Sequence, residues 1–415
     1  MGRLFFLMIV KIYGEMNFGN NFDNIINVEL PVVEMYREST NTKKVKEWTI
    51  IAFMNARNNL APHWIDKINE MEMVGSSDKV NVVVEIGRIS GYSSADGDWT
   101  GCRRYYIQKD TDTDKVTSPV LLETSKCDMG SWEYLVDFVK WTKNNYPAKR
   151  YILVIWDHGS GWKGKNKTRG ISYDEETNHY IKTTELKIAL EKIGGVDILA
   201  MDACLMQMIE VAYEVKDYVE YIVASEDAEP IPGYPMDRWI KALCENPNLN
   251  TKEITTFIVD SYVERYQSMF RAVTQSVVNT KKLEGLVVLI NQFIETLMFF
   301  NDKANAKTSS IYSWESWEPS HKDFYHFVKL VTDNTQFDEI KIKGKALLDY
   351  LKNNVIVYNK VYGSVNQNAY GISIYLPLSH PIISNNPISY PADYDKLLWA
   401  NDSKWDDLIK WVIKD

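Results

Sequence analysis

The sequence is poor in cysteine, carries an excess of acidic residues and contains no long apolar run. Its four cysteines, Cys102, Cys127, Cys204 and Cys244, form no Cys-x-x-Cys pair, which argues against a structural zinc site. They are too few for a disulfide scaffold in a chain of 415 residues. A net charge of −9 argues against nucleic acid or anionic lipid as the main partner. No stretch reaches the ~18 apolar residues that a membrane span needs.

Glycine-rich phosphate loops, internal repeats and low-complexity tracts are also absent, so a nucleotide-binding α/β protein is disfavoured. The run Leu4–Val10 lies between Arg3 and Lys11 and resembles a truncated signal peptide, but no small-x-small cleavage site follows it. The alternative is a misassigned start, with Met16 as the true beginning. The compartment, cytoplasmic or secreted, therefore stays open.

Strands and helices alternate from residue 47 onward, which predicts an α/β fold with a doubly wound, mostly parallel sheet flanked by helices. The apolar fraction of 45% is enough for a full core. We expect strands at Trp48–Phe53, Val80–Ile86, Tyr151–Trp156, Val196–Met201 and Val219–Ala224, a hairpin or edge element at Arg103–Ile107 and Val116–Leu122, and helices at His63–Met73, Ser131–Asn145, Thr184–Ile193 and from Leu205 to about Asp217.

Three regions follow from this pattern. We expect an N-terminal extension over residues 1–45, a core over 46–240, and a mostly helical C-terminal region over 241–415. The last region includes a late strand near 371–376. It could extend the sheet and brace the cleft.

Two of the predicted strands end in residues that can carry chemistry. Asp157, His158 and Gly159 follow one strand, and Asp202 and Cys204 follow another. Ligands and catalytic groups gather beyond the carboxyl ends of parallel strands, so neighbouring strands would bring the imidazole and the thiol to one cleft. That pair is the minimum for thiol catalysis. The alternative is that His158 and Cys204 have only structural roles, the cysteine as a buried thiol. We expect the other three cysteines to be buried structural cysteines.

The expected helix after Cys204 would place its thiol at a helix N-terminus, where the dipole favours the thiolate. Gly159 has no Cβ, so backbone can approach it closely. Its amide could then join the Cys204 amide in binding a developing oxyanion.

The segments WDHGSGW and MDACLMQMIEVAYEV resemble the histidine and cysteine motifs of the clostripain family, within the caspase-like clan of cysteine peptidases. The runs NVVVEIGR, VASEDAEP and TIIAFMNARNNL are also similar to that family, although Met54–Arg57 departs from the acidic turn expected there. The resemblance covers about residues 46–240 well and continues weakly to residues 370–378.

The resemblance implies a cysteine endopeptidase in which Cys204 attacks the scissile carbonyl and His158 transfers the proton. The amides of Gly159 and Cys204 would form the oxyanion hole. No third residue is required in this clan. Asp157 would then be structural.

The resemblance also places an acidic residue, Asp202, at the base of the S1 pocket, where it would pair with Arg or Lys at P1. The alternative for Asp202 is a helix N-cap. Ser225 and Glu226 are weaker candidates for the same cleft. The basic loop 163–169 joins the two motifs, and Lys167 and Arg169 are candidate self-cleavage sites. The alternative is a solvated loop.

We predict no cofactor and no metal site. Some family members depend on calcium, but the acidic cluster Asp174, Glu175 and Glu176 lacks EF-hand spacing. Expected partners are protein or peptide substrates with Arg or Lys at P1, and we expect a monomer.

Two other functions compete with this one. A catalytically silent caspase-like module that binds a protein partner would need neither His158 nor Cys204. A thiol hydrolase or transferase could act on a non-peptide acyl group. A papain-like protease is disfavoured, because that pattern places Cys before His.

Overall fold

The computed structural model describes residues 43–163, 170–378 and 390–414, and its centre is one mixed sheet of nine strands. The strands are β1 (Lys46–Ala56), β2 (Val80–Arg88), β3 (Gly101–Tyr106), β4 (Val120–Thr124), β5 (Ala148–Trp156), β8 (Val196–Asp202), β9 (Val219–Ala224), β10 (Val273–Asn279) and β12 (Ile356–Tyr362). Their order is β12-β10-β9-β8-β5-β1-β2-β3-β4. The five central strands from β9 to β2 run parallel, and the outer strands pair antiparallel.

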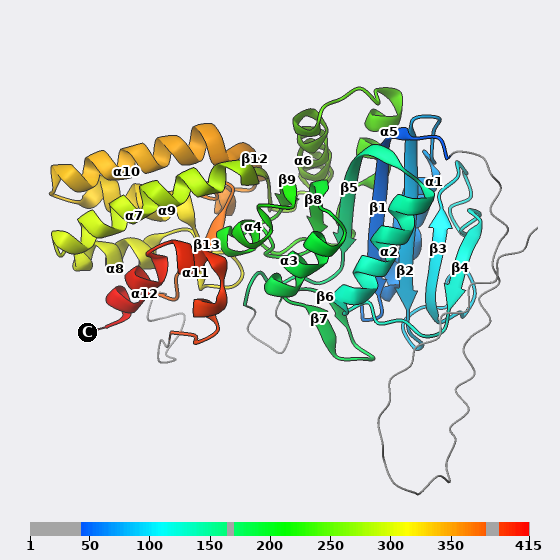
Figure 1. The fold of residues 1–415 in the computed structure, drawn as a ribbon, viewed down its shortest axis with the longest axis horizontal. Coiled ribbons are helices and arrows are strands. Elements are labelled where there is room, and N and C mark those ends of the chain that lie inside the picture. The colour runs from blue at the N-terminus through cyan, green and yellow to red at the C-terminus, as the bar shows by residue number, and fades with distance from the viewer. Residues whose placement is uncertain (1–42, 164–169, 379–389, 415) are drawn as a thin grey trace, which may run out of the picture. The chain divides into compact units, whose positions relative to one another are not determined.

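Both faces of the sheet are covered, which explains why the central strands read as continuous apolar runs. Successive residues point to opposite faces, so Ile51 and Phe53 join one core while Ile50 and Ala52 join the other. Helices α2 (Trp132–Asn145), α3 (Thr183–Lys192) and α4 (Ile209–Val215) cover the first face, and α1 (Trp64–Glu72), α5 (Met236–Glu245) and α6 (Thr251–Ser268) cover the second (Figure 1).

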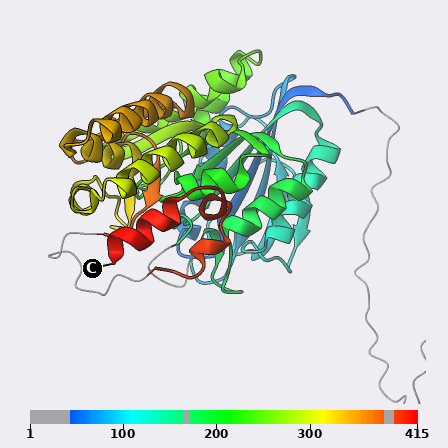
Figure 2. The same ribbon diagram turned by 60° about the vertical axis from the view of Figure 1, so that its left-hand side comes forward.

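The C-terminal region is mainly helical and lies at the β12 end of the sheet, with α11 packed on α4 (Figures 1 and 2). Its helices are α7 (Leu283–Phe299), α8 (Lys303–Tyr312), α9 (Phe324–Asn334), α10 (Asp338–Tyr350), α11 (Leu398–Asp402) and α12 (Trp405–Ile413). Small sheets are formed by β11 (His321–Asp323) with β13 (Ser373–Tyr375) and by β6 (Ile171–Asp174) with β7 (His179–Ile181). Short helical turns are η1 (Ala61–His63), η2 (Thr280–Lys282), η3 (Leu351–Val355), η4 (Ser364–Asn366) and η5 (Tyr394–Lys396).

The predicted fold class is confirmed, and the five expected buried strands are the five parallel strands. Ser131 caps α2 as predicted, accepting a hydrogen bond from the Tyr134 amide. The helix expected from Leu205 begins only at Ile209, because the chain between them turns and Leu205 has a positive φ of 65°. The region after 240 also supplies β10 and β12 to the main sheet, whereas the late strand β13 pairs with β11 instead.

A disulfide joins Cys102 on β3 to Cys127 in the segment before α2, so the prediction that both are plain buried thiols was wrong. Cys204 and Cys244 are free. In the described part of the chain, the helices are too short or too polar to cross a membrane.

Candidate active site

The carboxyl ends of β5 and β8 lie side by side, with Trp156 opposite Asp202 in the parallel register. Each strand continues into one of the two motifs, so His158 and Cys204 reach the same opening from neighbouring strands. They line a cavity of about 130 Å³. Its wall is completed by Leu60, Trp156, Asp157, Asp202, Ala203, Glu229, Pro230, Ile231, Pro232 and Gly233.

Cys204 lies in the turn between β8 and α4, five residues before Ile209, the first residue of the helix. The predicted position at a helix N-terminus was therefore wrong, and the dipole of α4 does not reach the thiol. The Glu229 amide donates to Sγ at 3.2 Å. Burial nevertheless raises the pKa of the Cys204 thiol, and the nearby carboxylates of Asp227 and Asp202 act in the same direction.

His158 is half-buried, and its Nε2 lies 2.7 Å from Oδ1 of Asn59. Burial lowers the pKa of the imidazole, and the Glu175 carboxylate opposes this shift. Together with the raised pKa of Cys204, this shift favours the neutral forms of the imidazole and the thiol in the free protein.

Asp157, the residue before the histidine, accepts hydrogen bonds from two asparagines at and just beyond the end of β1. Asn55 Nδ2 donates to Oδ2 at 2.8 Å, and Asn58 Nδ2 donates to Oδ1 at 2.7 Å. The carboxyl group is almost fully buried, and burial raises its pKa. These bonds anchor the backbone just before His158, in keeping with a structural role for Asp157.

Gly159 packs directly on the backbone of the cysteine turn. A Cβ at this position would lie 2.4 Å from the Cys204 carbonyl oxygen and 3.0 Å from the Ala203 Cβ. Gly159 also forms an isolated antiparallel β-bridge with Ile171. The hydrogen bonds of this bridge are made by the neighbours of Gly159, since Ser160 N donates to Gly170 O and Ser172 N donates to His158 O. The Gly159 N–H therefore takes no part in the bridge. Gly159 is not among the residues that line the cavity.

Asp202 lies at the floor of the cavity and is 4% exposed. The Tyr234 amide donates to both of its carboxylate oxygens, at 3.1 and 3.0 Å, and Lys67 Nζ lies 3.4 Å from Oδ2. The alternative of a helix N-cap is wrong, because the N-cap of α4 is Met208. Gly233 fits against the carboxylate, since a Cβ there would lie 2.2 Å from Oδ1.

A second carboxyl group, that of Glu229, faces Asp202 in the same cavity. Both of its oxygens are buried and receive no hydrogen bond from a donor in the described residues. Burial and the adjacent Asp202 raise the pKa of Glu229 well above its ordinary value. Glu229 was missed from the sequence, although it lies within the VASEDAEP run.

Ser225 and Glu226, the residues predicted for this place, do not line the cavity. Ser225 Oγ bonds Thr274 Oγ1 at 2.8 Å, and Glu226 accepts from the Gly371 amide at 2.8 Å. The chain after β9 folds back over the cysteine turn, with Leu205 N bonded to Asp227 O at 3.1 Å. This reversal carries Glu229 to the thiol.

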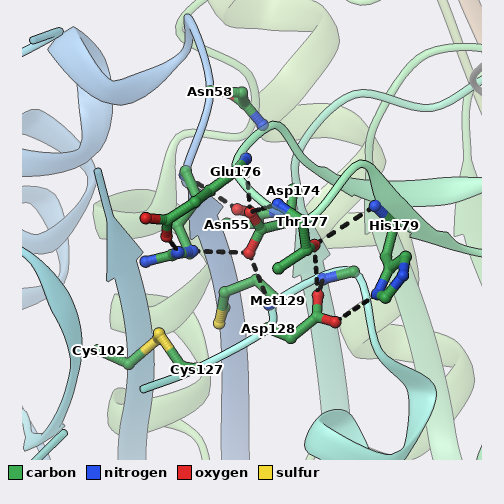
Figure 3. A network of polar contacts seen from close by, with 12 residues as sticks. Asn55, Asn58, Cys102, Cys127, Asp128, Met129, Asp174, Glu176, Thr177 and His179 are labelled. Carbon is green, nitrogen blue, oxygen red and sulfur yellow. Dashed lines mark hydrogen bonds and ion pairs between the residues drawn. A yellow bond between two sulfur atoms is a disulfide. The ribbon is translucent and has the colours of Figure 1, made fainter. Parts of the chain in front are cut away.

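Two carboxylates of the acidic cluster, those of Asp174 and Glu176, are paired with an arginine of this chain. Arg57 Nε donates to Asp174 Oδ2 at 2.6 Å, and its guanidinium also pairs with Glu176. Asp174 further accepts from the Met129 amide at 3.0 Å (Figure 3). Among the described residues, no group of three or more His, Cys, Asp and Glu side chains is arranged to hold a metal.

Two further predictions concern residues outside the cavity. Lys167 and Arg169 lie outside the described residues.

The C-terminal region, for which no role was predicted beyond bracing, contacts the cysteine turn, since Ser373 N donates to Gln207 O at 2.9 Å. Glu210, at the start of α4, accepts from Tyr375 N and Tyr394 Oη, both at 2.8 Å. The two contacts support the turn that carries Cys204.

Comparison with known proteins gives one family. The model of the clostripain family, Peptidase_C11, matches residues 52–411. Clostripain of Hathewaya histolytica is 29% identical over 233 residues, which are 50% of this chain and 44% of that protein, so the match spans less than half of the relative's length.

Solved structures share the fold. A secreted C11 cysteine protease from Bacteroides thetaiotaomicron, in complex with an irreversible peptide inhibitor, superposes with a TM-score of 0.66 at 19% identity, covering 87% of this chain and 99% of that one. An inactive zymogen C11 protease from Parabacteroides distasonis gives a TM-score of 0.62 at 19% identity, covering 86% and 98%.

Proposed function

Since the chain belongs to the clostripain family of cysteine endopeptidases, we propose that it cleaves peptide bonds after Arg or Lys, with Cys204 as nucleophile and His158 as proton carrier. The observation that carries the proposal is the cavity itself. It holds a thiol, an imidazole and two buried carboxyl groups, those of Asp202 and Glu229.

The reaction begins with proton transfer, because burial favours the neutral form of both partners in the free protein. His158 takes the proton of Cys204 as the sulfur attacks the scissile carbonyl carbon. The imidazolium then protonates the leaving amine, and a water molecule hydrolyses the thioester, with His158 acting as base. A neutral pair of this kind avoids holding an ion pair in a half-buried site before substrate arrives.

The oxyanion of each tetrahedral intermediate is assigned to the amides of Gly159 and Cys204. The close packing of Gly159 on the Cys204 backbone supports this assignment only in that the two residues are neighbours in space. Each such donor typically contributes a factor of about 10²–10³ to the rate.

Specificity for a basic P1 residue would come from Asp202 and Glu229 together. Lys67 already compensates the Asp202 charge from beneath, whereas Glu229 has no cation partner of comparable distance among the described residues. Burial and the adjacent Asp202 raise the pKa of Glu229, which favours its protonated form in the free enzyme. A P1 guanidinium or ammonium would displace that proton and pair with the carboxylate.

We keep self-cleavage at Lys167 or Arg169 as part of the proposal, because an enzyme of this specificity would find its own substrate in the basic loop between its two motifs. Wild-type protein should then appear as two fragments on a denaturing gel, whereas Cys204→Ala protein should stay intact. A single intact band from both proteins would contradict it.

The test of the function uses fluorogenic peptides that differ only at P1, with Arg, Lys, Asp or Ala. Wild-type protein should release the fluorophore after Arg and Lys. Cys204→Ala should be inactive, and Cys244→Ala, which removes the other free thiol, should retain activity. Asp202→Asn and Glu229→Gln should each raise KM for the basic peptides. Cleavage after Asp, or activity independent of Cys204, would overturn the proposal.

A further inference from the structure

Asn59 is in direct contact with the proposed proton carrier. It comes from the turn that follows β1, the strand next to β5 in the sheet. Its Oδ1 lies 2.7 Å from Nε2 of His158. A carboxamide oxygen can only accept a hydrogen bond, so this contact requires a proton on Nε2 of the imidazole.

The turn that carries Asn59 is fixed at several points. Asn58 Oδ1 accepts from the Leu60 amide at 2.9 Å, and Asn58 Nδ2 also donates to Tyr173 O at 2.8 Å. Asn55 Oδ1 accepts from the Arg57 amide at 2.9 Å. Since Asn55 and Asn58 also hold the Asp157 carboxyl group, one short segment positions both the residue before His158 and its ring.

We propose that Asn59 is a positioning residue for the reaction, and that it acts by holding His158 in the Nε2–H tautomer with Nδ1 free to take the proton of Cys204. This inference rests on the proposed function. In a neutral imidazole only one nitrogen carries a proton, so fixing it on Nε2 leaves the lone pair of Nδ1 for the thiol.

The step balances without any change in Asn59. The S–H bond of Cys204 breaks, its proton moves to Nδ1, and the sulfur electron pair forms the bond to the carbonyl carbon. The imidazolium carries a positive charge partly on Nε2–H, and the Asn59 oxygen stabilises that charge through a stronger hydrogen bond. When Nδ1 gives its proton to the leaving amine, the original tautomer is restored.

The side chain of Asn59 is exposed, whereas its neighbours Asn58 and Leu60 are buried. Packing therefore does not require an asparagine here. Asn59→Ala should fold as stably as the wild type, so a change in its kinetics can be read as a change in the reaction.

Kinetics with a P1-Arg peptide give the first test. Asn59→Ala should lower kcat by about 10- to 100-fold, as expected for a lost hydrogen bond to a charged group, with little change in KM. Asn144→Ala, at an exposed asparagine on α2, is the matched control and should match the wild type. Equal kcat values for Asn59→Ala and wild type would overturn the proposal.

The pH profile separates positioning from a merely structural role. Asn59→Asp keeps an acceptor and adds a negative charge, so it should restore part of the lost kcat and move the acidic limb of kcat/KM to higher pH. Asn59→Ala should move that limb to lower pH, because the imidazolium loses its acceptor. Limbs that coincide in the two variants would contradict the inference.

A measurement without substrate keeps this inference distinct from the proposed function. In ¹⁵N-labelled Cys204→Ala protein, the ring nitrogens of His158 should show the Nε2–H tautomer, and adding Asn59→Ala should produce a mixture. The His158 signals are identified among the six histidines by their loss in His158→Gln. An Nδ1–H tautomer would overturn the role of Asn59 even if peptides are cleaved. If the Nε2–H tautomer is observed but no peptide is cleaved, the proposed function is contradicted and the role of Asn59 in fixing the tautomer is not.

Discussion

Gly159 and Cys204 are in contact through their backbones, at the point where the two motifs meet. The Cβ of an alanine at position 159 would lie 2.4 Å from the Cys204 carbonyl oxygen, closer than van der Waals contact allows. Because the obstacle is backbone, a side-chain rotation cannot relieve it. The cysteine turn or the histidine segment would have to move.

Gly159→Ala should therefore cost about 1–3 kcal/mol of folding free energy through overpacking. It should also lower kcat by at least about 100-fold, because the two amides assigned to the oxyanion are displaced. Chemical denaturation and peptide hydrolysis measure the two effects. Gly91→Ala is the control, since no atom lies within 4 Å of a Cβ there, and it should keep its activity despite a φ of +90°. Unchanged kcat in Gly159→Ala would argue against this oxyanion site.

The buried ion pair of Lys67 and Asp202 gives a second prediction. The two side chains are 1% and 2% exposed, and Nζ lies 3.4 Å from Oδ2. Lys67→Met leaves the Asp202 charge buried beside Glu229 without its cation, which should cost about 3–5 kcal/mol of stability. The double variant Lys67→Met/Asp202→Asn removes both charges and should recover a large part of that loss.

Urea unfolding of the two variants and the wild type measures this coupling. Lys192→Met, at an exposed lysine of α3, provides the control for the substitution itself. If the double variant is no more stable than Lys67→Met, the pair does not act as a unit beneath the pocket.

The parts of the fold that could be predicted are those that depend on local pattern. Each central strand is buried on both faces and so reads as an apolar run, as from Tyr151 to Trp156. Ser131 signals its helix because its side chain satisfies a backbone amide of the first turn. His158 and Cys204 could be singled out as candidates because each lies two residues beyond the end of such a strand.

What could not be predicted depends on contacts between distant segments. Glu229 reaches the thiol only because the chain reverses after β9. Asn59 reaches the imidazole because β1 lies next to β5, which no local pattern indicates. The false helix start at Leu205 has a different cause. Residues 205–208 (Leu, Met, Gln, Met) all have a high helix propensity, but they are held in a turn by bonds to residues 225, 227 and 373.

The disulfide between Cys102 and Cys127 yields a third prediction. It closes a loop with a sequence separation of 25 and ties β3 to the segment that includes Met129 (Figure 3). In the chain-entropy description, such a crosslink stabilises the fold by about 3 kcal/mol. Replacing both cysteines by serine should lower the unfolding free energy by that order.

Thermal unfolding with and without a thiol reductant provides the measurement. The wild type should lose stability on reduction, whereas the Cys102→Ser/Cys127→Ser protein should not respond. Cys244→Ser is the control, since this thiol is free, and it should respond to reductant as the wild type does. A wild-type melting temperature that is the same with and without reductant would show that the crosslink is absent or without consequence.

The last prediction concerns Glu210, the buried carboxyl group beneath the C-terminal region. It accepts from Tyr375 N and Tyr394 Oη, and burial raises its pKa from 4.5 to about 7. Between these two values the folded state binds more protons than the unfolded state, so stability must fall as the pH rises. The contribution is fully present below about pH 4.5 and is lost as the pH rises through about 7, a total of about 3 kcal/mol.

Glu210→Gln keeps an acceptor oxygen for the two donors but cannot ionise. Its stability relative to the wild type should therefore increase by about 3 kcal/mol between pH 4.5 and pH 8, as measured by urea unfolding across that range. Other buried groups with raised pKa values, such as Asp323, are common to both proteins and cancel in the difference. Glu191→Gln, at an exposed position on α3, should show no such trend. A constant difference between Glu210→Gln and wild type would mean that Glu210 does not change its protonation in this range, and that the contact of α4 with the C-terminal region is insensitive to pH.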